Sequence, residues 1–257
     1  MTLAILGLLL LSANPDLLDQ GYHEMYNLQF DAAHKTFHRF EAAHPDDPLG
    51  PVSDAAAYLF YEFDRLQILR SDFFTSDSKF LNGKALKPDP AVKQRFEADL
   101  DKTKQLAKPD NERGMFATVL RLALQADYDA LIDKRYGQSL TEIKSARNEA
   151  TKLLAKYPHC YDANLAPGVE NYLLSQKSAP IRWLLSLTGA QTDKQKGIQD
   201  LKLVAEKGNY LKPYAKVLLA IAALRDHDKP RAKQLLTELA RQFPQNDLFQ
   251  KELKHLS

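Results

Sequence analysis

Apolar residues recur three and four positions apart along most of the chain, and short turns rich in Pro, Gly, Asn and Asp separate the segments that show this spacing. The spacing is typical of amphipathic α-helices that bury one face. We expect a loop over 75–89 and a bend or break of the long helix near Pro167 and Pro180. The pattern predicts helices over residues 15–28, 30–43, 50–74, 90–107, 111–135, 139–157, 161–187, 193–207, 211–226, 228–243 and 246–255.

Four of these segments share an internal spacing. A small residue is followed four positions later by an apolar residue, and eight positions after that by a residue that ends the helix. A small side chain lets a second helix cross closely at that point. Gly21 and Ala220 lie twelve positions before two of these small residues, which places a small residue on the preceding helix as well. The sets are Ala33, Phe37 and Pro45; Ala146, Ala150 and Pro158; Ala232, Leu236 and Pro244; and Gly197, Leu201 and Asn209.

This arrangement resembles the tetratricopeptide repeat, a helix-turn-helix unit of about 34 residues. The C-terminal third strengthens the resemblance, because a repeat that ends in "EKG" precedes an aromatic residue and a final repeat that closes on "FPQNDLF". Together with "NLQFDAAHKTFHRFEAAHPDDPLG" near the front, these motifs are similar to a group of bacterial, mostly exported tetratricopeptide proteins of unassigned function. The middle departs from the pattern, since the predicted helices 50–74 and 111–135 exceed the usual repeat length.

The resemblance implies an all-α solenoid of antiparallel tetratricopeptide-like helix pairs, irregular in the middle, with residues 14–257 as a single domain. It also implies a non-enzymatic scaffold that binds a protein or peptide partner. The chain shows no phosphate-binding glycine loop and no nucleophile elbow, so we expect no enzyme activity, no cofactor and no small-molecule substrate. A structural subunit that assembles with copies of itself is an alternative.

Residues 1–13, "MTLAILGLLLLSA", form an apolar run that is too short to span a bilayer and has the length of a signal-peptide core. We therefore expect export to the periplasm or beyond. The run has no Lys or Arg before it, which leaves a membrane anchor, a membrane-surface contact through residues 1–13, or a cytoplasmic protein as alternatives. Cys160 is the only cysteine, so one chain cannot form an internal disulfide.

Aromatic residues mark the candidate partner-binding groove. Tyr and Arg offer a large contact area with a polar tip and are favoured at interfaces. The alternative is that the aromatic helix is packed on both sides in the core. Trp183 presents the same choice between a core residue and an exposed docking patch. The groove candidates are Tyr22, Tyr26, Tyr58, Tyr61 and Arg65.

Two histidines, His34 and His38, share one face of the predicted helix 30–43, and imidazoles at this spacing can bind a metal ion. The repeat pattern places them on the flank of the packing stripe, and no third ligand is fixed by the sequence. We therefore predict no metal site. A metal-binding protein or enzyme that uses His34 and His38 with His23 and Glu41 is the alternative.

Charge excludes one class of partner. The formal net charge is only +2, and the 35 basic residues are interleaved with 33 acidic residues. Such a pattern is typical of solvated helix faces and not of a basic stripe that follows a nucleic-acid backbone. We expect no binding to DNA or RNA.

Overall fold

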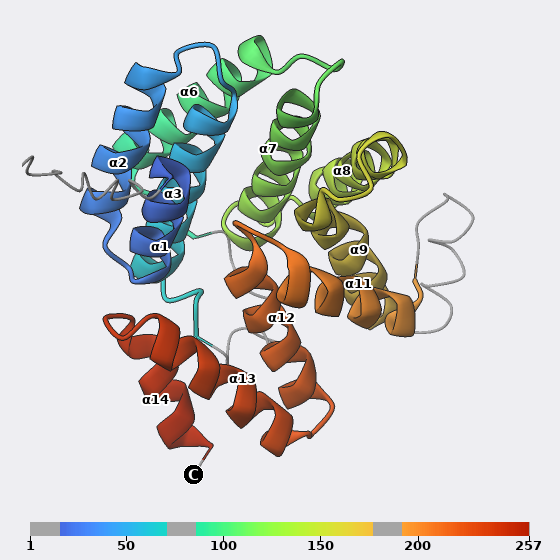
Figure 1. Ribbon diagram of the computed structural model, residues 1–257. Coiled ribbons are helices and arrows are strands. Elements are labelled where there is room, and N and C mark those ends of the chain that lie inside the picture. The colour runs from blue at the N-terminus through green and yellow to red at the C-terminus, as the bar shows by residue number, and fades with distance from the viewer. Residues whose placement is uncertain (1–15, 71–85, 177–191, 257) are drawn as a thin grey trace, which may run out of the picture.

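The protein is described here by a computed structural model that covers residues 16–70, 86–176 and 192–256. All regular structure in these ranges is helical, which confirms the predicted all-α class, and consecutive helices pack as neighbouring pairs (Figure 1). The helices are α1 (Leu17–Tyr26), α2 (Phe30–Ala43), α3 (Leu49–Arg65), α6 (Pro90–Leu106), α7 (Glu112–Leu131), α8 (Tyr136–Lys156), α9 (Leu165–Ser175), α11 (Lys194–Lys207), α12 (Lys212–Arg225), α13 (Lys229–Gln242) and α14 (Asp247–His255), with a short 3-10 helix, η1 (Tyr161–Asn164), before α9.

Small residues lie where paired helices approach each other. A Cβ atom added to Gly21 of α1 would come within 2.3 Å of the Phe37 ring of α2. A Cβ atom on Gly197 of α11 would come within 2.6 Å of the backbone nitrogen of Tyr172 in α9. Ala33, Ala146 and Ala232 are 0 to 1% exposed. The small residues of the repeated spacing therefore lie in the packed interior, as the sequence pattern predicts.

Helix α3 ends nine residues before the predicted boundary at 74, so the prediction of one helix over 50–74 is wrong. Gln67 adopts a left-handed backbone conformation with φ of 62°. The N–H of Ile68 then donates to the carbonyl of Phe63, and the N–H of Gln67 donates to that of Asp64. Phe63 and Ile68 are both buried. This is a complete Schellman motif, which glycine usually forms, and a glutamine in its place gave no stop signal.

The predicted helix 161–187 begins instead as the 3-10 helix η1, and the α-helix α9 starts at Leu165. Pro167 does not break α9, because it lies in the first turn, where a backbone N–H has no partner within the helix. The described part of the helix ends at Ser175. Pro180 and Trp183 fall outside the described residues, as do residues 1–13 and most of the predicted loop 75–89.

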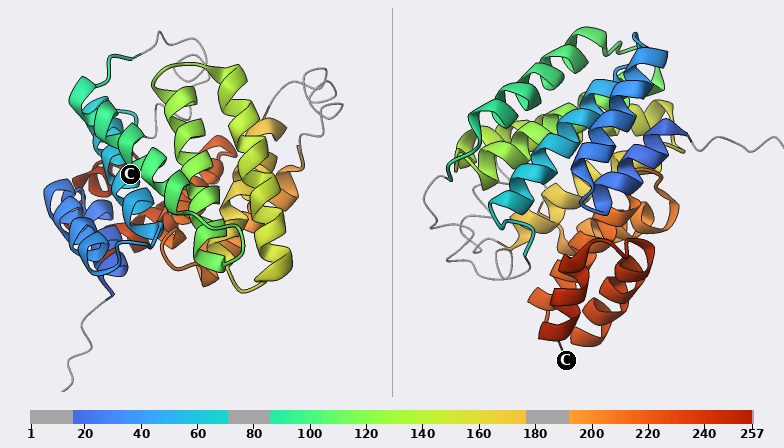
Figure 2. Two further views of the ribbon diagram at one scale, coloured as in Figure 1. Left: turned by 90° about the horizontal axis from the view of Figure 1, so that it is seen from above. Right: turned by 90° about the vertical axis from the view of Figure 1, so that its left-hand side faces the viewer.

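The end of the first helix, α1, lies beside the turn that leads into the last described helix, α14 (Figure 2). The amide of Asn246, just before α14, donates to the carbonyl of Tyr26 at 2.9 Å, and the N–H of Gln245 donates to the side chain of Asn27 at 3.1 Å. The rings of Tyr22 and Tyr210 stack with centroids 5.0 Å apart. The start of helix α12 lies between α1 and α3 on one side and α7 and α9 on the other (Figure 1).

Among the described helices, none combines the length and the apolar character that crossing a membrane requires.

Candidate functional site

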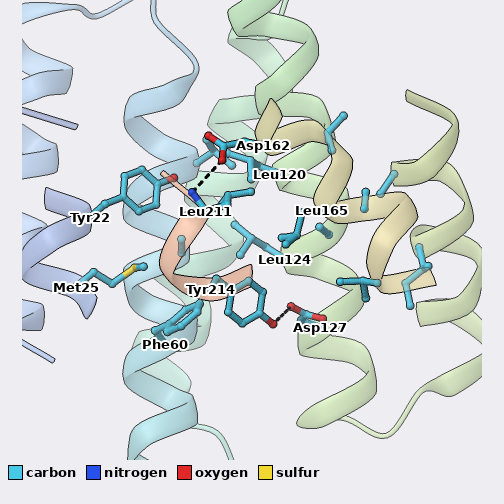
Figure 3. A pocket seen from close by; sticks show the side chains of 18 of the residues that line it. Tyr22, Met25, Phe60, Leu120, Leu124, Asp127, Asp162, Leu165, Leu211 and Tyr214 are labelled. Carbon is cyan, nitrogen blue, oxygen red and sulfur yellow. Dashed lines mark hydrogen bonds between the residues drawn. The ribbon is translucent and has the colours of Figure 1, made fainter. Parts of the chain in front are cut away.

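A cavity with a volume of about 70 Å³ lies around the start of α12 (Figure 3). Helices α1, α3, α7, α8 and α9 supply its other walls. Almost all of its surface is aliphatic or aromatic. Its lining consists of Tyr22, Met25, Tyr26, Val52, Ala56, Phe60, Val119, Leu120, Ala123, Leu124, Asp127, Ile143, Ala146, Asp162, Leu165, Ala166, Val169, Leu211 and Tyr214.

Asp127 is the carboxyl group that faces this apolar space. Its Oδ2 accepts a hydrogen bond from the hydroxyl of Tyr214 at 3.4 Å, and the two side chains point toward each other from α7 and α12 (Figure 3). Burial raises the pKa of Asp127 to about 7, although the Tyr214 hydroxyl acts in the opposite direction. The residue as a whole is half-buried. An apolar pocket with a few polar groups of shifted pKa is the usual form of a ligand site.

Asp162 has a structural task at the other end of the cavity. Its carboxylate accepts backbone N–H groups of Asn209, Tyr210 and Leu211 at 3.0 to 3.2 Å, at the N-terminus of α12 (Figure 3). These N–H groups belong to the turn that leads into α12, and a buried backbone N–H group needs an acceptor. Gly208 permits this contact, since a Cβ atom on it would come within 2.4 Å of Asp162 Oδ1. The glycine of the "EKG" motif therefore makes room for the carboxylate that binds the turn before α12.

A second apolar cavity, of about 80 Å³, lies between α1, α3 and the C-terminal helices α12 to α14. It shares Met25, Tyr26, Phe60 and Tyr214 with the first cavity. The three rings among these pack edge to face, with centroids 6.1 Å apart for Tyr26 and Phe60 and 5.5 Å apart for Phe60 and Tyr214. The two cavities are thus separated only by a layer of side chains.

The five predicted groove residues do not form one exposed surface. Tyr22 and Tyr26 are 4% and 6% exposed and line the first cavity, while their hydroxyls bond to Ser53 and to the Tyr210 carbonyl. Tyr58 is also buried and lies on another face of α3, where its hydroxyl accepts a hydrogen bond from Arg95 at 3.3 Å.

Tyr61 is 38% exposed, and its ring lies edge-on against Phe30. Arg65, one turn further along α3, is also exposed. Arg65 holds the buried Glu62 through two hydrogen bonds of 2.9 and 2.7 Å and donates a third to the Lys87 carbonyl. The Arg65 guanidinium therefore neutralises the buried Glu62 carboxylate and connects the end of α3 to the segment that leads into α6.

The histidines of α2 lie beside a buried carboxylate. His34 Nδ1 is 2.5 Å from Asp54 Oδ1, and His38 Nε2 is 2.9 Å from Asp54 Oδ2. Asp54 comes from α3 and is 1% exposed. The Tyr58 ring stacks on His34 with centroids 3.9 Å apart. His23 is not part of this group, because it is exposed on α1 against Asn27 and Phe243.

Two further carboxyl groups face the same point. Glu41 Oε2 pairs with Lys102 of α6 at 2.5 Å. Asp99, also from α6, is half-buried next to Asp54. Burial raises the pKa of Asp99 to about 8, and the charges of Asp54 and Glu41 and a hydrogen bond to Asp54 act in the same direction. Three carboxyl groups and two imidazoles are therefore gathered between α2, α3 and α6.

Three acidic residues of these sites, Asp54, Asp99 and Asp127, were not recognised as candidates from the sequence. Asp54, Asp99 and Asp127 each lie inside a helix, and the helical periodicity gave them no separate signal. Asp127 does carry a recognisable mark, because Leu124 and Leu131, three residues before it and four after it, are buried on the same helix face. An acid within such an apolar stripe indicates a buried partner or a cavity.

The lone thiol of Cys160 is half-buried, and burial raises its pKa to about 12. At neutral pH it is protonated, and a thiol is a poor nucleophile.

Comparisons of the chain with protein-family models, with curated proteins and with solved structures found no match. The interpretation of both sites therefore depends on their geometry and chemistry.

Proposed function

We propose that the chain is a non-enzymatic scaffold of tetratricopeptide-like helix pairs, in a solenoid whose ends have come together, that binds an apolar segment of a protein or peptide partner. The cavity around the start of α12 carries this proposal. A core without a ligand is normally packed to high density and holds no carboxyl group that lacks a charged partner. Here an apolar space and a half-buried Asp127 occur together.

The size of the cavities suits side chains better than a whole helix. A water molecule needs about 10 to 15 Å³ by this measure, so about 70 Å³ corresponds to roughly five waters, or to one large aliphatic or aromatic side chain. The adjoining cavity of about 80 Å³ has similar capacity. A peptide that places one bulky apolar residue in each cavity, and a basic residue near Asp127, fits both the space and the charge.

Export through residues 1–13 belongs to the same proposal, with the partner in the cell envelope. Fractionation tests it independently. Full-length protein found in the cytosol with residues 1–13 intact would reject export and leave the binding proposal standing.

The binding proposal is tested by selecting displayed peptides on the full chain. Selected peptides are expected to carry two bulky apolar residues and one basic residue. Ala123→Leu fills part of the first cavity, and Asp127→Asn removes its charge; each is expected to weaken binding at least tenfold by isothermal titration calorimetry. Ala98→Leu is the matched control, because Ala98 is an exposed residue of α6 outside the cavity.

Two results would contradict the proposal. One is the selection of peptides that bind Ala123→Leu as tightly as the unaltered protein, since they would then bind elsewhere. The other is uptake of a small apolar dye such as Nile red, lost in Ala123→Leu, without any selected peptide. That outcome would assign the cavity to a small apolar ligand.

A further inference from the structure

We propose that His38, Glu41 and Asp54 form a binding site for a divalent transition-metal ion such as Zn²⁺. One nitrogen of His38 and one carboxylate oxygen each of Glu41 and Asp54 all lie within 4.8 Å of one another. This site is separate from the apolar cavity, since none of the three residues lines it.

The fold brings the three groups together by simple helix geometry. His38 and Glu41 are three positions apart on α2 and therefore share a face. Asp54 faces them from α3, which packs against α2. Gly50, one turn before Asp54, leaves room for the Glu41 side chain, because a Cβ atom on Gly50 would come within 2.4 Å of Glu41 Cγ.

One oxygen at this point lacks a partner. Glu41 Oε2 is paired with Lys102, but Oε1 is buried and accepts no hydrogen bond from the described residues. An acceptor buried without a donor is unfavourable, and a cation would satisfy it.

The distances fit a small cation after modest side-chain movement. Zinc binds nitrogen and carboxylate oxygen at about 2.0 to 2.2 Å, which places the ligand atoms of a tetrahedral site roughly 3.3 to 3.5 Å apart. His38 Nε2 and Asp54 Oδ2 are already 2.9 Å apart. The ligand atoms of the three residues lie at most 4.8 Å apart, so the widest gap exceeds the spacing of a tetrahedral zinc site by at most about 1.5 Å.

Neighbouring side chains contact the proposed ligands and orient them, as residues that hydrogen-bond to metal ligands do in known metal sites. His34 contacts the second oxygen of Asp54 at 2.5 Å, and Lys102 contacts the second oxygen of Glu41 at 2.5 Å. The imidazole ligand favours transition metals over Mg²⁺ and Ca²⁺, which prefer oxygen. The His38 side chain is 60% exposed, so a water molecule can complete the coordination from the solvent side.

The alternative is that His34 and His38 serve only as hydrogen-bonding partners that neutralise the buried Asp54. That arrangement accounts for Asp54 and leaves Glu41 Oε1 without a partner. The two interpretations differ in one measurable property, which is the affinity for a metal ion.

The test uses the full chain without a polyhistidine tag. Titration calorimetry with Zn²⁺ and elemental analysis after dialysis are expected to give one Zn²⁺ per chain. His38→Ala and Glu41→Gln are each expected to lower the affinity at least tenfold, as loss of a ligand requires. His44→Ala is the matched control, because His44 is exposed near the end of the same helix and does not contact the cluster.

Circular dichroism confirms that each variant is folded, and Glu41→Gln keeps the shape of the side chain if His38→Ala proves unstable. Co²⁺ provides a second readout, because its visible absorption reports coordination by nitrogen and oxygen. The proposal is overturned if the protein binds no Zn²⁺, or if His38→Ala and Glu41→Gln bind it as well as the unaltered chain does. The latter result would identify adventitious binding to surface histidines.

Discussion

Alanine at Gly197 provides a direct test of the close helix crossing inferred from the repeated spacing. An added Cβ atom would lie 2.6 Å from the Tyr172 backbone nitrogen and 2.9 Å from the Gly168 carbonyl oxygen. Backbone atoms cannot turn aside as a flexible side chain can, so α9 and α11 must move apart. Overpacking of this kind costs about 1 to 3 kcal/mol, and backbone contacts place it in the upper half of that range.

Helix propensity partly offsets this loss, because alanine is more favourable than glycine in a helix by about 1 kcal/mol. The expected net effect of Gly197→Ala is a loss of about 1 to 2 kcal/mol in the free energy of unfolding. Gly137→Ala is the matched control. Gly137 is an exposed position in the first turn of α8, and a Cβ atom there meets nothing within 4 Å. Its expected effect is a gain of up to about 1 kcal/mol.

Urea unfolding followed by circular dichroism measures both variants, with the m-value as a check that the same surface is exposed. The two variants should differ by about 2 to 3 kcal/mol. For a chain of this size, each kcal/mol corresponds to roughly 2 to 4 °C in Tm. If Gly197→Ala is as stable as Gly137→Ala, the small residue is not required at the crossing, and the explanation of the repeated spacing is refuted.

Three further changes follow from contacts already described. Asp162→Ala removes the acceptor of three backbone N–H groups and should lower the free energy of unfolding by about 3 kcal/mol in urea, with a smaller loss for Asp162→Asn. Asp127 has a folded pKa of about 7 against an ordinary value of 3.8, so folding takes up a proton between these values and stability falls as pH rises through this window. Asp99, whose pKa is about 8, acts in the same direction. Asp127→Asn should therefore reduce the slope of stability against pH, in unfolding measured from pH 4 to 8, by the contribution of one group. Gln67→Gly removes the steric cost of a side chain in a left-handed backbone conformation, so it should add about 1 kcal/mol to the free energy of unfolding and raise Tm. An unchanged Tm would contradict the role of Gln67 in ending α3.

Most helices were predictable because their apolar faces repeat with the helical period over two or more turns. Helix α2 has the predicted bounds, and its C-terminus lies just before Pro45, which the sequence marks as a helix stop. The end of α3 was not predictable in this way. It depends on Gln67 in a conformation that the burial of Ile68 against Phe63 stabilises, and local sequence preference does not indicate it.

In the candidate sites, too, features set by helical spacing were predictable and features set by the packing of one helix on another were not. The alignment of His34, His38 and Glu41 on one helix face follows from their spacing alone. Their convergence on Asp54 depends on how α2 packs against α3, and helical periodicity does not indicate which residues of two packed helices face each other. For the same reason the tyrosines chosen as groove residues could not be divided between the buried positions of Tyr22 and Tyr58 and the exposed position of Tyr61.

The hydrogen bond between Asn246 and the Tyr26 carbonyl joins residues that are 220 positions apart. Contacts of such long range form slowly, because a large loop must be closed before they contribute. Translation proceeds at about 5 to 20 residues per second, so the ribosome needs roughly 10 to 40 s to make the C-terminal partner of α1 after α1 itself. During that interval the end of α1 lacks the contact with the turn before α14, although Phe60 of α3 can already pack on Tyr26.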